Sequence, residues 1–306
     1  MNTELEQIVT EVGKVIKGKD EVIRKVLAAV LAGGHVLLED IPGVGKTTLA
    51  MALGRSMELE YKRMQFTPDV LPSDIVGFTM YNSATREFEY KKGAVFCNLF
   101  LADELNRTSS KTQSALLEVM EEAKVTVDGV SYPLPSPFTV IATENPFGSS
   151  GTQLLPESQL DRFLICLSVG YPSHQAAVDI LKNSAGDGLN QVQRVITTER
   201  LMELRKQAET LHVENNIYEY VVRLTEATRQ NPNIALGVSP RGGIALLKMA
   251  KAMALMRGGE YVIPEDVLSV INDVWRHRIH LNAKVRAEGM DVSDVILDIT
   301  ERIHAI

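Results

Sequence analysis

The sequence contains few of the residues that mark secreted, metal-binding or membrane-spanning chains. Its 306 residues include only two cysteines, Cys97 and Cys166. Neither has a Cys or His neighbour at the spacing of a metal site, so we interpret both as small core residues in a reducing compartment. No apolar run approaches about 18 residues, and the acidic N-terminal segment lacks the pattern of a signal peptide. These absences predict a cytoplasmic protein with no membrane span.

The chain also lacks an excess of positive charge. Its 32 basic and 39 acidic residues give a net charge of −7. This balance argues against nucleic acid as a partner, although it leaves room for a local basic patch. The apolar content of 45% and charged content of 23% are those of an ordinary globular protein. A chain of this length corresponds to about two domains, and we find no internal repeat.

Glycine is missing from one position where a phosphate-binding loop ordinarily carries it. The segment from Leu38 to Thr47 reads Leu-Glu-Asp-Ile-Pro-Gly-Val-Gly-Lys-Thr, between a strand-like run and a helix-forming run. Asp40 stands where the P-loop motif opens with glycine, and the rest of the motif is intact. Glycines let such a loop wrap a phosphate, and the amides at the start of the following helix point at it. We therefore predict a variant P-loop.

In this P-loop, Lys46 is expected to reach the β- and γ-phosphates of ATP, and the Thr47 hydroxyl is expected to hold Mg²⁺. The residues predicted to bind the nucleotide are Asp40, Pro42, Gly43, Val44, Gly45, Lys46, Thr47 and Thr48.

Strand-like and helix-like segments alternate as far as about residue 170. The run from Val95 to Ala102 is apolar except for Asn98, which is typical of a buried parallel strand. Residues 80–90 and the two runs flanking Asp128–Gly129 predict β-hairpins. The alternation predicts an α/β fold with a parallel sheet covered by helices.

At the N-terminus, Thr3 and Glu6 suggest a capping box for a helix ending at Gly18, and Asp20 suggests the cap of a second helix.

Beyond residue 173 the pattern is helical almost throughout. Glycines and small polar residues in 183–190 suggest a linker. We expect an α/β nucleotide-binding core in residues 1–185 and a helical lid in residues 186–306. Helices are expected near residues 198–211, 215–230, 239–257, 264–275 and 291–304, with His277 and Arg278 interpreted as lid packing.

ATP hydrolysis needs a carboxylate for the metal and a base for the attacking water. Asp103 ends the buried strand and is the candidate metal-binding carboxylate. Glu104, directly after it, is the candidate base that orients and deprotonates water. Asn145 follows the next strand and could hydrogen-bond the γ-phosphate or the water. An acidic pair at a strand end about 60 residues after a P-loop favours this interpretation.

These motifs resemble the MoxR family of AAA+ ATPases over nearly the whole chain. The P-loop, including its aspartate, looks like the Walker A motif of that family. Further runs with the same resemblance are Gln65-Phe66-Thr67-Pro68-Asp69, Ala102-Asp103-Glu104-Leu105-Asn106-Arg107, Lys111-Thr112-Gln113-Ser114-Ala115-Leu116-Leu117-Glu118, Ala142-Thr143-Glu144-Asn145-Pro146, Gln159-Leu160-Asp161-Arg162-Phe163 and Ser239-Pro240-Arg241.

The resemblance implies a P-loop NTPase (AAA+) domain with β-hairpin insertions and a C-terminal all-helical lid domain. It assigns Asn145 to sensor 1, Arg162 to an arginine finger that reaches the neighbouring subunit's γ-phosphate, and Arg241 to sensor 2. Arg107 is a second candidate for the same subunit interface. An arginine acting between subunits supplies about 10³ to 10⁵ in rate. The resemblance therefore implies a homo-oligomeric ring, expected to be a hexamer.

The resemblance further implies chaperone-like remodelling, maturation or metal-cofactor insertion of partner proteins, together with proteins that carry von Willebrand factor A domains. The hairpins are the expected working parts, and Phe66, Phe88 and Tyr132 either grip a client or pack internally.

Other functions stay open at this point. One is a motor similar to the magnesium chelatase subunit or to a DNA-remodelling helicase. Another is an ATP-binding scaffold with little turnover, which Glu104 argues against because a scaffold needs no base. A small-molecule P-loop kinase is disfavoured by Arg162, Arg241 and the helical lid together.

Overall fold

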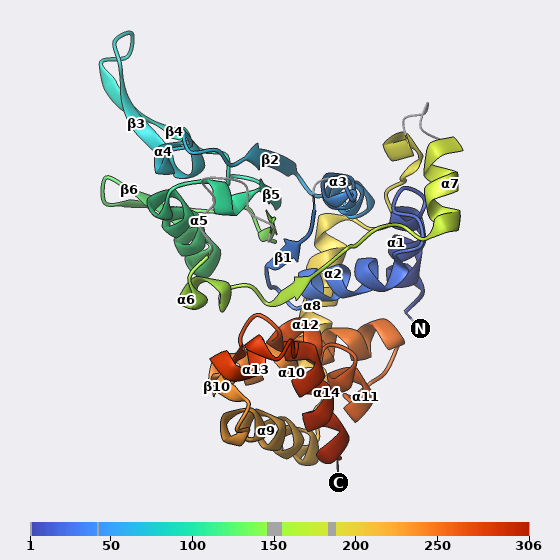
Figure 1. Cartoon of the computed structure of the whole chain (residues 1–306). Coiled ribbons are helices and arrows are strands. Elements are labelled where there is room, and N and C mark those ends of the chain that lie inside the picture. The colour runs from blue at the N-terminus through green and yellow to red at the C-terminus, as the bar shows by residue number, and fades with distance from the viewer. Residues whose placement is uncertain (1, 42, 146–154, 183–187, 306) are drawn as a thin grey trace.

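A parallel sheet forms the centre of the computed structural model, which describes residues 2–41, 43–145, 155–182 and 188–305 (Figure 1). The five strands lie in the order β2-β5-β8-β1-β9, and every neighbouring pair is parallel. They are β1 (Val36–Glu39), β2 (Tyr61–Gln65), β5 (Leu99–Asp103), β8 (Thr139–Glu144) and β9 (Ile165–Leu167). The predicted α/β class with a parallel sheet is confirmed.

Alternate residues of the strands face two separate hydrophobic clusters, as the pleat of a sheet requires. In β1, for example, Val36 and Leu38 face one cluster and Leu37 faces the other. The first cluster includes residues of α1, α2 and α3, and the second includes residues of α5. The helices of this part are α1 (Thr3–Gly13), α2 (Asp20–Leu31), α3 (Lys46–Ser56), α4 (Pro72–Val76), η1 (Leu105–Arg107), α5 (Ser110–Glu122), α6 (Glu157–Leu160) and α7 (His174–Lys182).

Both predicted hairpins are present and touch each other. The first, β3 (Gly77–Asn82) with β4 (Glu87–Lys92), projects from the body of the molecule (Figure 1). The second is β6 (Lys124–Val127) with β7 (Val130–Pro133). Its two-residue loop places Asp128 and Gly129 at φ 51° and 79°, the positive values that such a tight turn needs.

The three aromatic residues considered as client contacts have different environments. Phe66 is completely buried, so it packs internally. Tyr132 stacks on Tyr90 with the ring centroids 4.1 Å apart, which joins the two hairpins. Phe88 is 76% exposed on the projecting hairpin.

The C-terminal part is a helical lid that carries one small antiparallel pair of strands. Its elements are η2 (Gly188–Gln191), α8 (Thr198–Thr210), α9 (Asn215–Gln230), β10 (Ile234–Leu236), α10 (Pro240–Arg257), α11 (Pro264–Leu268), α12 (Ile271–Trp275), β11 (His280–Leu281), α13 (Ala283–Ala287) and α14 (Val292–Arg302). The expected division between residues 185 and 186 lies outside the described residues. Lid helices α8 and α10 pack against α2, and one hydrophobic cluster runs from Leu5 to Ile299.

The N-terminal predictions were partly wrong. Asn2, not Thr3, is the N-cap of α1, because its Oδ1 accepts a hydrogen bond from Leu5 N at 3.4 Å. The helix ends at Gly13 rather than Gly18. Lys19, not Asp20, stands at the N-cap position of α2, without a side-chain cap. Local sequence spacing thus located these helices but not their caps.

Two element boundaries also differ from the prediction. The strand expected from Val95 begins at Leu99, because the Asn98 side chain bonds to backbone on both sides, accepting from Glu60 N and donating to Pro137 O. The helix expected over 264–275 is divided into α11 and α12, since Val270 leaves helical geometry with φ −125° and ψ −4°. Within the described ranges, no helix is long and apolar enough to cross a membrane.

Candidate active site

The loop after β1 leads directly into α3, as the P-loop prediction requires. Gly45 is the N-cap residue of α3 with φ 93°, and Gly43 has φ 86°. Both values lie in the left-handed region that glycine adopts without strain. The loop borders a pocket of about 380 Å³ whose described lining residues are Gly43, Gly45, Lys46, Thr47, Thr48, Arg63, Gln65, Asp103, Glu104 and Asn145.

Lys46 is buried at this pocket and points back along the loop. Its Nζ donates to the Asp40 carbonyl oxygen at 2.8 Å. Burial lowers the pKa of Lys46, and the nearby carboxylates of Asp40, Asp103 and Glu104 partly offset that effect. A phosphate group would supply the compensating charge that this buried ammonium requires.

Two of the predicted loop residues, Asp40 and Val44, contact other parts of the protein and do not appear in the described lining of the pocket. The carboxylate of Asp40 accepts hydrogen bonds from the backbone amides of Val169 and Gly170, just beyond β9. It therefore fastens the start of the loop to the neighbouring strand, and neither it nor Val44 is among the described lining residues. Val44 packs against the hydrophobic core. Pro42 lies outside the described residues.

Asp103 lies at the carboxyl end of β5 and is held by two strands. Its Oδ1 accepts from the hydroxyl of Thr143 at 2.6 Å. Its Oδ2 accepts from Arg63 Nη2 at 2.7 Å, and the same nitrogen donates to Gln65 at 2.9 Å. Thr143, Arg63 and Gln65 are not among the site residues that the sequence predicts. The available signal was that adjacent parallel strands bring their carboxyl ends together.

Glu104 has a backbone conformation that is rare for a residue with a side chain, with φ 56°. Its amide donates to the Thr143 hydroxyl at 2.8 Å, so one threonine orients both acidic residues. The Glu104 carboxylate pairs with Arg107 at 2.5 Å. Asn145 is placed at the pocket, with its carbonyl oxygen bonded to the buried Asn106 amide at 3.2 Å. The positive φ of Glu104 is a backbone strain of the kind that concentrates at functional sites.

The residues predicted to hold Mg²⁺ fit that ion together with a nucleotide. Thr47 and Asp103 line the same pocket and offer one hydroxyl and one carboxylate. Over the described ranges, no group of three or more His, Cys, Asp or Glu residues could hold a metal by itself. This donor set suits Mg²⁺, which proteins commonly bind through one or two carboxylates plus substrate phosphates and water.

The ends of the paired strands β1 and β8 carry two carboxyl groups at the same register, Glu39 and Glu144. Burial, and then the nearby charge of Glu39, raise the pKa of Glu144 to about 7, while a hydrogen bond from the Leu155 backbone opposes the rise. Glu39 pairs with Arg276 of the lid at 2.9 Å. The core therefore touches the lid directly at the strand that precedes the P-loop.

The two predicted catalytic arginines lie together but outside the pocket. Arg162 and Arg241 pair with the same carboxylate, Glu121 on α5, at 3.5 and 3.1 Å. Arg241 occupies the predicted first turn of α10, with Ser239 as N-cap and Pro240 as the first helical residue. Neither arginine is among the described residues that line the P-loop pocket. The structure thus brings the candidate arginine finger, Arg162, and the candidate sensor 2 residue, Arg241, together at Glu121.

Arg278 has a larger role than the lid packing expected for it. Its buried guanidinium donates to Asp161 Oδ1 at 2.7 Å, to Phe163 O at 2.6 Å and to Leu164 O at 3.2 Å. These acceptors lie on both sides of Arg162. His277 also contacts Phe163 O, at 3.1 Å. The lid therefore holds the backbone segment that carries the candidate finger.

The fold and the site define an AAA+ ATPase. Residues 35–165 match the family model described as "ATPase family associated with various cellular activities (AAA)", and residues 226–299 match the AAA lid domain. The chain belongs to the MoxR family of these proteins. It is 40% identical over 301 residues to Chaperone MoxR1 of Mycobacterium tuberculosis, covering 95% of this chain and 80% of that protein.

Two further comparisons agree with this assignment. An uncharacterised protein of Bacillus subtilis, YeaC, is 45% identical, covering 98% of this chain and 94% of its own. The crystal structure of a candidate ATPase from Cytophaga hutchinsonii superposes with a TM-score of 0.92 at 37% identity, covering 99% of this chain and 95% of that one.

Proposed function

We propose that this protein hydrolyses ATP to ADP and phosphate in a ring, expected to be hexameric, in which each active site is completed by the neighbouring subunit. The observation that carries the proposal is the separation of the site into two parts. Lys46, Asp103 and Glu104 lie around one pocket, whereas Arg162 and Arg241 lie together on Glu121. A cationic pair away from its own pocket is suited to serve the pocket of another copy.

In the proposed reaction, the P-loop amides and Lys46 bind the phosphates of ATP, and Thr47 and Asp103 hold Mg²⁺. The metal, when bound, would neutralise charge that develops on the phosphates. Glu104 orients and deprotonates the attacking water, and Asn145 hydrogen-bonds the γ-phosphate or that water. The Arg107 pair restrains Glu104 until nucleotide and neighbour are in place. Arg162 and Arg241 stabilise the transferring phosphoryl group from the next subunit.

Mixing two inactive variants tests action between subunits. Glu104→Gln lacks the base but keeps its finger, and Arg162→Ala keeps the base but lacks the finger. We expect each to lose at least about 10³-fold in ATPase rate, and an equimolar mixture to regain activity at interfaces that combine the two intact parts. A mixture of Lys46→Ala with Glu104→Gln is the control, because every site then lacks one residue of its own subunit. Inactivity of both mixtures would show that Arg162 serves its own site.

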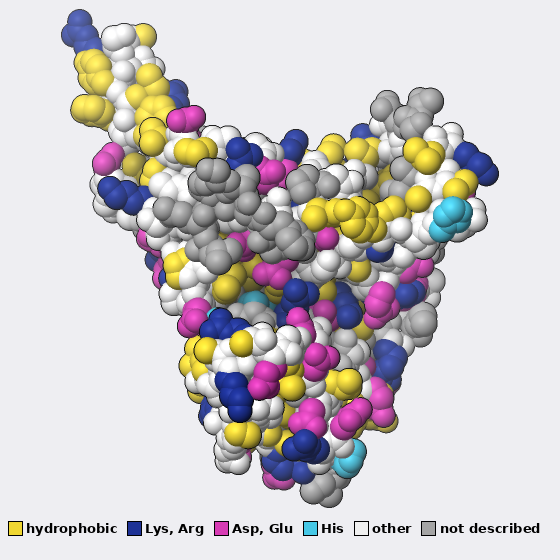
Figure 2. Space-filling model, viewed as in Figure 1, with side chains coloured by type: hydrophobic (Ala, Val, Ile, Leu, Met, Phe, Trp, Pro, Cys, Tyr) yellow, Lys and Arg dark blue, Asp and Glu magenta, His cyan; other side chains and the backbone are white. Residues whose placement is uncertain are grey.

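We further propose that ATP turnover drives chaperone-like remodelling, maturation or metal-cofactor insertion of partner proteins, including proteins with von Willebrand factor A domains. The name of the mycobacterial relative supports a chaperone role. The β3–β4 hairpin supports a client contact, because it projects from the body with exposed apolar side chains (Figure 2). The most exposed of these are Phe78, Met80, Tyr81 and Phe88.

A further inference from the structure

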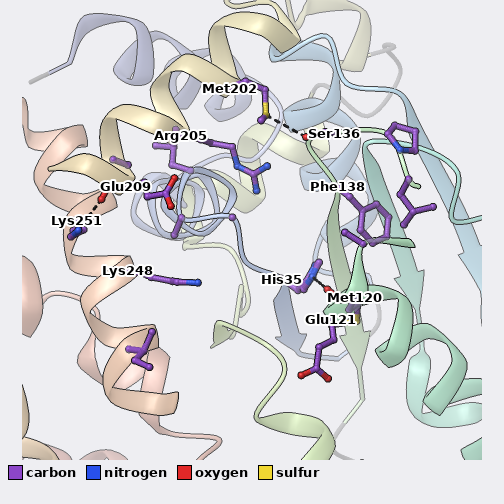
Figure 3. Close-up of a pocket in the computed structure, with 18 of the residues that line it drawn as sticks. His35, Met120, Glu121, Ser136, Phe138, Met202, Arg205, Glu209, Lys248 and Lys251 are labelled. Carbon is purple, nitrogen blue, oxygen red and sulfur yellow. Dashed lines mark hydrogen bonds between the residues drawn. The ribbon is translucent and has the colours of Figure 1, made fainter. Parts of the chain in front are cut away.

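A cavity larger than the nucleotide pocket lies apart from that pocket. It has a volume of about 610 Å³ and lies between the α/β core and the helices α8 and α10 (Figure 3). His35 and Phe138 line it from positions just before β1 and β8. The opposite ends of the same strands lead to the P-loop and to Asn145. The cavity is therefore at the other end of the sheet and shares no described lining residue with the P-loop pocket.

Much of the wall is apolar and comes from both parts of the chain. A volume of several hundred Å³ with such a wall is typical of small-molecule sites. The larger apolar residues on the core side are Leu31, Met120, Leu134, Pro135 and Phe138, and those on the lid side are Met202, Ile244 and Leu247. An apolar body placed here would contact the core and the lid together.

The wall carries more positive than negative side chains, and two of the cations have no carboxylate partner among the described residues. Arg205 donates its Nε to Val30 O at 2.8 Å, and its two terminal nitrogens have no hydrogen-bond acceptor among the described residues. Lys248 has no ion-pair partner there, and Lys251 donates only to the backbone carbonyl of Glu209. In Figure 3, Arg205 and Lys248 extend into the cavity from the side of α8 and α10. Burial lowers the pKa of Arg205, and no carboxylate contributes to that shift.

The two carboxylates and the histidine of the wall do not neutralise this positive charge. Glu121 is already paired with two arginines outside the cavity. Glu209 is the remaining carboxylate, set against three cations. His35 is internally satisfied, because its Nδ1 accepts from Val140 N and its Nε2 donates to Met120 O, both at 2.9 Å. Its burial lowers its pKa to about 4, which keeps the ring neutral.

We propose that this cavity is a binding site for a small amphiphilic anion, a carboxylate or phosphate monoester attached to an apolar body. The guanidinium of Arg205 presents two nitrogens that have no acceptor among the described residues, in the planar arrangement that matches carboxylate and phosphate oxygens. Lys248 supplies a second charge, and the apolar wall receives the body. Because the bound molecule bridges core and lid, its occupancy stabilises their present arrangement. The proposal concerns a site other than the nucleotide site and does not depend on the reaction proposed above.

Calorimetric titration of the 306-residue protein with four probes tests the chemistry of the site. Octanoate and octyl phosphate share an apolar chain and differ in the anionic head, so they distinguish the two classes. Octylamine carries the same chain with a positive charge, and inorganic phosphate has the head without the chain. We expect one equivalent of octanoate, octyl phosphate or both to bind in the presence of saturating Mg-ADP. Equal binding of octylamine, or displacement by Mg-ADP, would overturn the proposal.

Substitutions in the wall test its location. We expect Arg205→Gln and Lys248→Gln each to weaken binding about tenfold or more, since each removes a charged hydrogen bond. Lys248 is exposed, so its replacement leaves the fold intact even if Arg205→Gln is destabilising. Ile244→Glu, at a position that is 59% exposed, should abolish binding by placing a like charge in the site. Lys206→Gln, on the same helix as Arg205 but outside the wall, is the matched control. Unchanged affinity in the Lys248 and Ile244 variants would place the anion elsewhere.

Discussion

At the scale of single residues, Glu144 is a carboxyl group held where its charged form is costly. Its pKa is raised from 4.5 to about 7, first by burial and then by Glu39. A folded-state pKa above the unfolded value means that the protonated form is favoured by folding. Stability is therefore greatest at low pH for this group and falls between about pH 4.5 and 7, by about 3 kcal/mol in total.

Replacing Glu144 by glutamine should remove that pH dependence. We expect the Glu144→Gln variant, compared with wild type, to gain more unfolding free energy at about pH 8 than at about pH 5. Urea unfolding at the two pH values measures this difference. Glu301→Gln, at an exposed position on α14, is the control and should change neither value. An equal gain at both pH values would mean that Glu144 does not titrate in this range.

The candidate site residues that the sequence indicated are those whose evidence is local. Lys46 and Thr47 follow a recognisable strand and loop within ten residues. Asp103 and Glu104 end an apolar run. Thr143 and Arg63 carried no such evidence, because each reaches Asp103 across 40 residues of chain, through strand pairing. The spacing along the chain indicated the candidate residues, but the hydrogen bonds that orient them depend on the register of the sheet.

At the scale of elements, the segment from the end of α6 to β9 depends on one lid side chain. Arg278 bonds to Asp161, Phe163 and Leu164, and its side chain is 4% exposed. The sequence could not predict this contact, since 117 residues separate Arg278 from Asp161. It correctly located α10 and the cap at Ser239, which depend on neighbouring residues. The same segment carries Arg162. A lid residue therefore holds the backbone on both sides of the candidate arginine finger.

We expect Arg278→Lys to lower the ATPase kcat without raising the KM for ATP. A single ammonium cannot serve acceptors on residues 161, 163 and 164, so Arg162 would be misplaced while the P-loop pocket is unchanged. Loss of these buried bonds should also cost about 3 kcal/mol of stability. Steady-state kinetics below the melting temperature separate the two effects, and Arg302→Lys in an exposed ion pair of α14 is the control. A raised KM with unchanged kcat would contradict a role through Arg162.

At the scale of the whole molecule, the expected core and lid share one hydrophobic cluster. It includes Leu27 of α2 and Trp275 of α12, both completely buried. Helix α2 packs against α8 and α10, which belong to the lid by sequence. The sequence suggested a linker in 183–190 because the glycines and small polar residues there favour a flexible chain. Composition does not report whether the parts on either side of a linker share a core, because that depends on contacts between helices far apart in the sequence. Two regions of sequence therefore form one packing unit.

This shared cluster predicts that the subunit unfolds in a single step. Trp275 is the only tryptophan of the chain and lies in the lid, so its fluorescence reports the lid, while far-UV circular dichroism reports all helices. At concentrations where sizing shows the monomer, we expect both signals to change at the same urea concentration. Leu27→Ala, in the N-terminal part, should lower both midpoints together through a loss of about 2 to 5 kcal/mol. A Trp275 transition that Leu27→Ala leaves in place would mean that residues 186–306 fold independently of the α/β core.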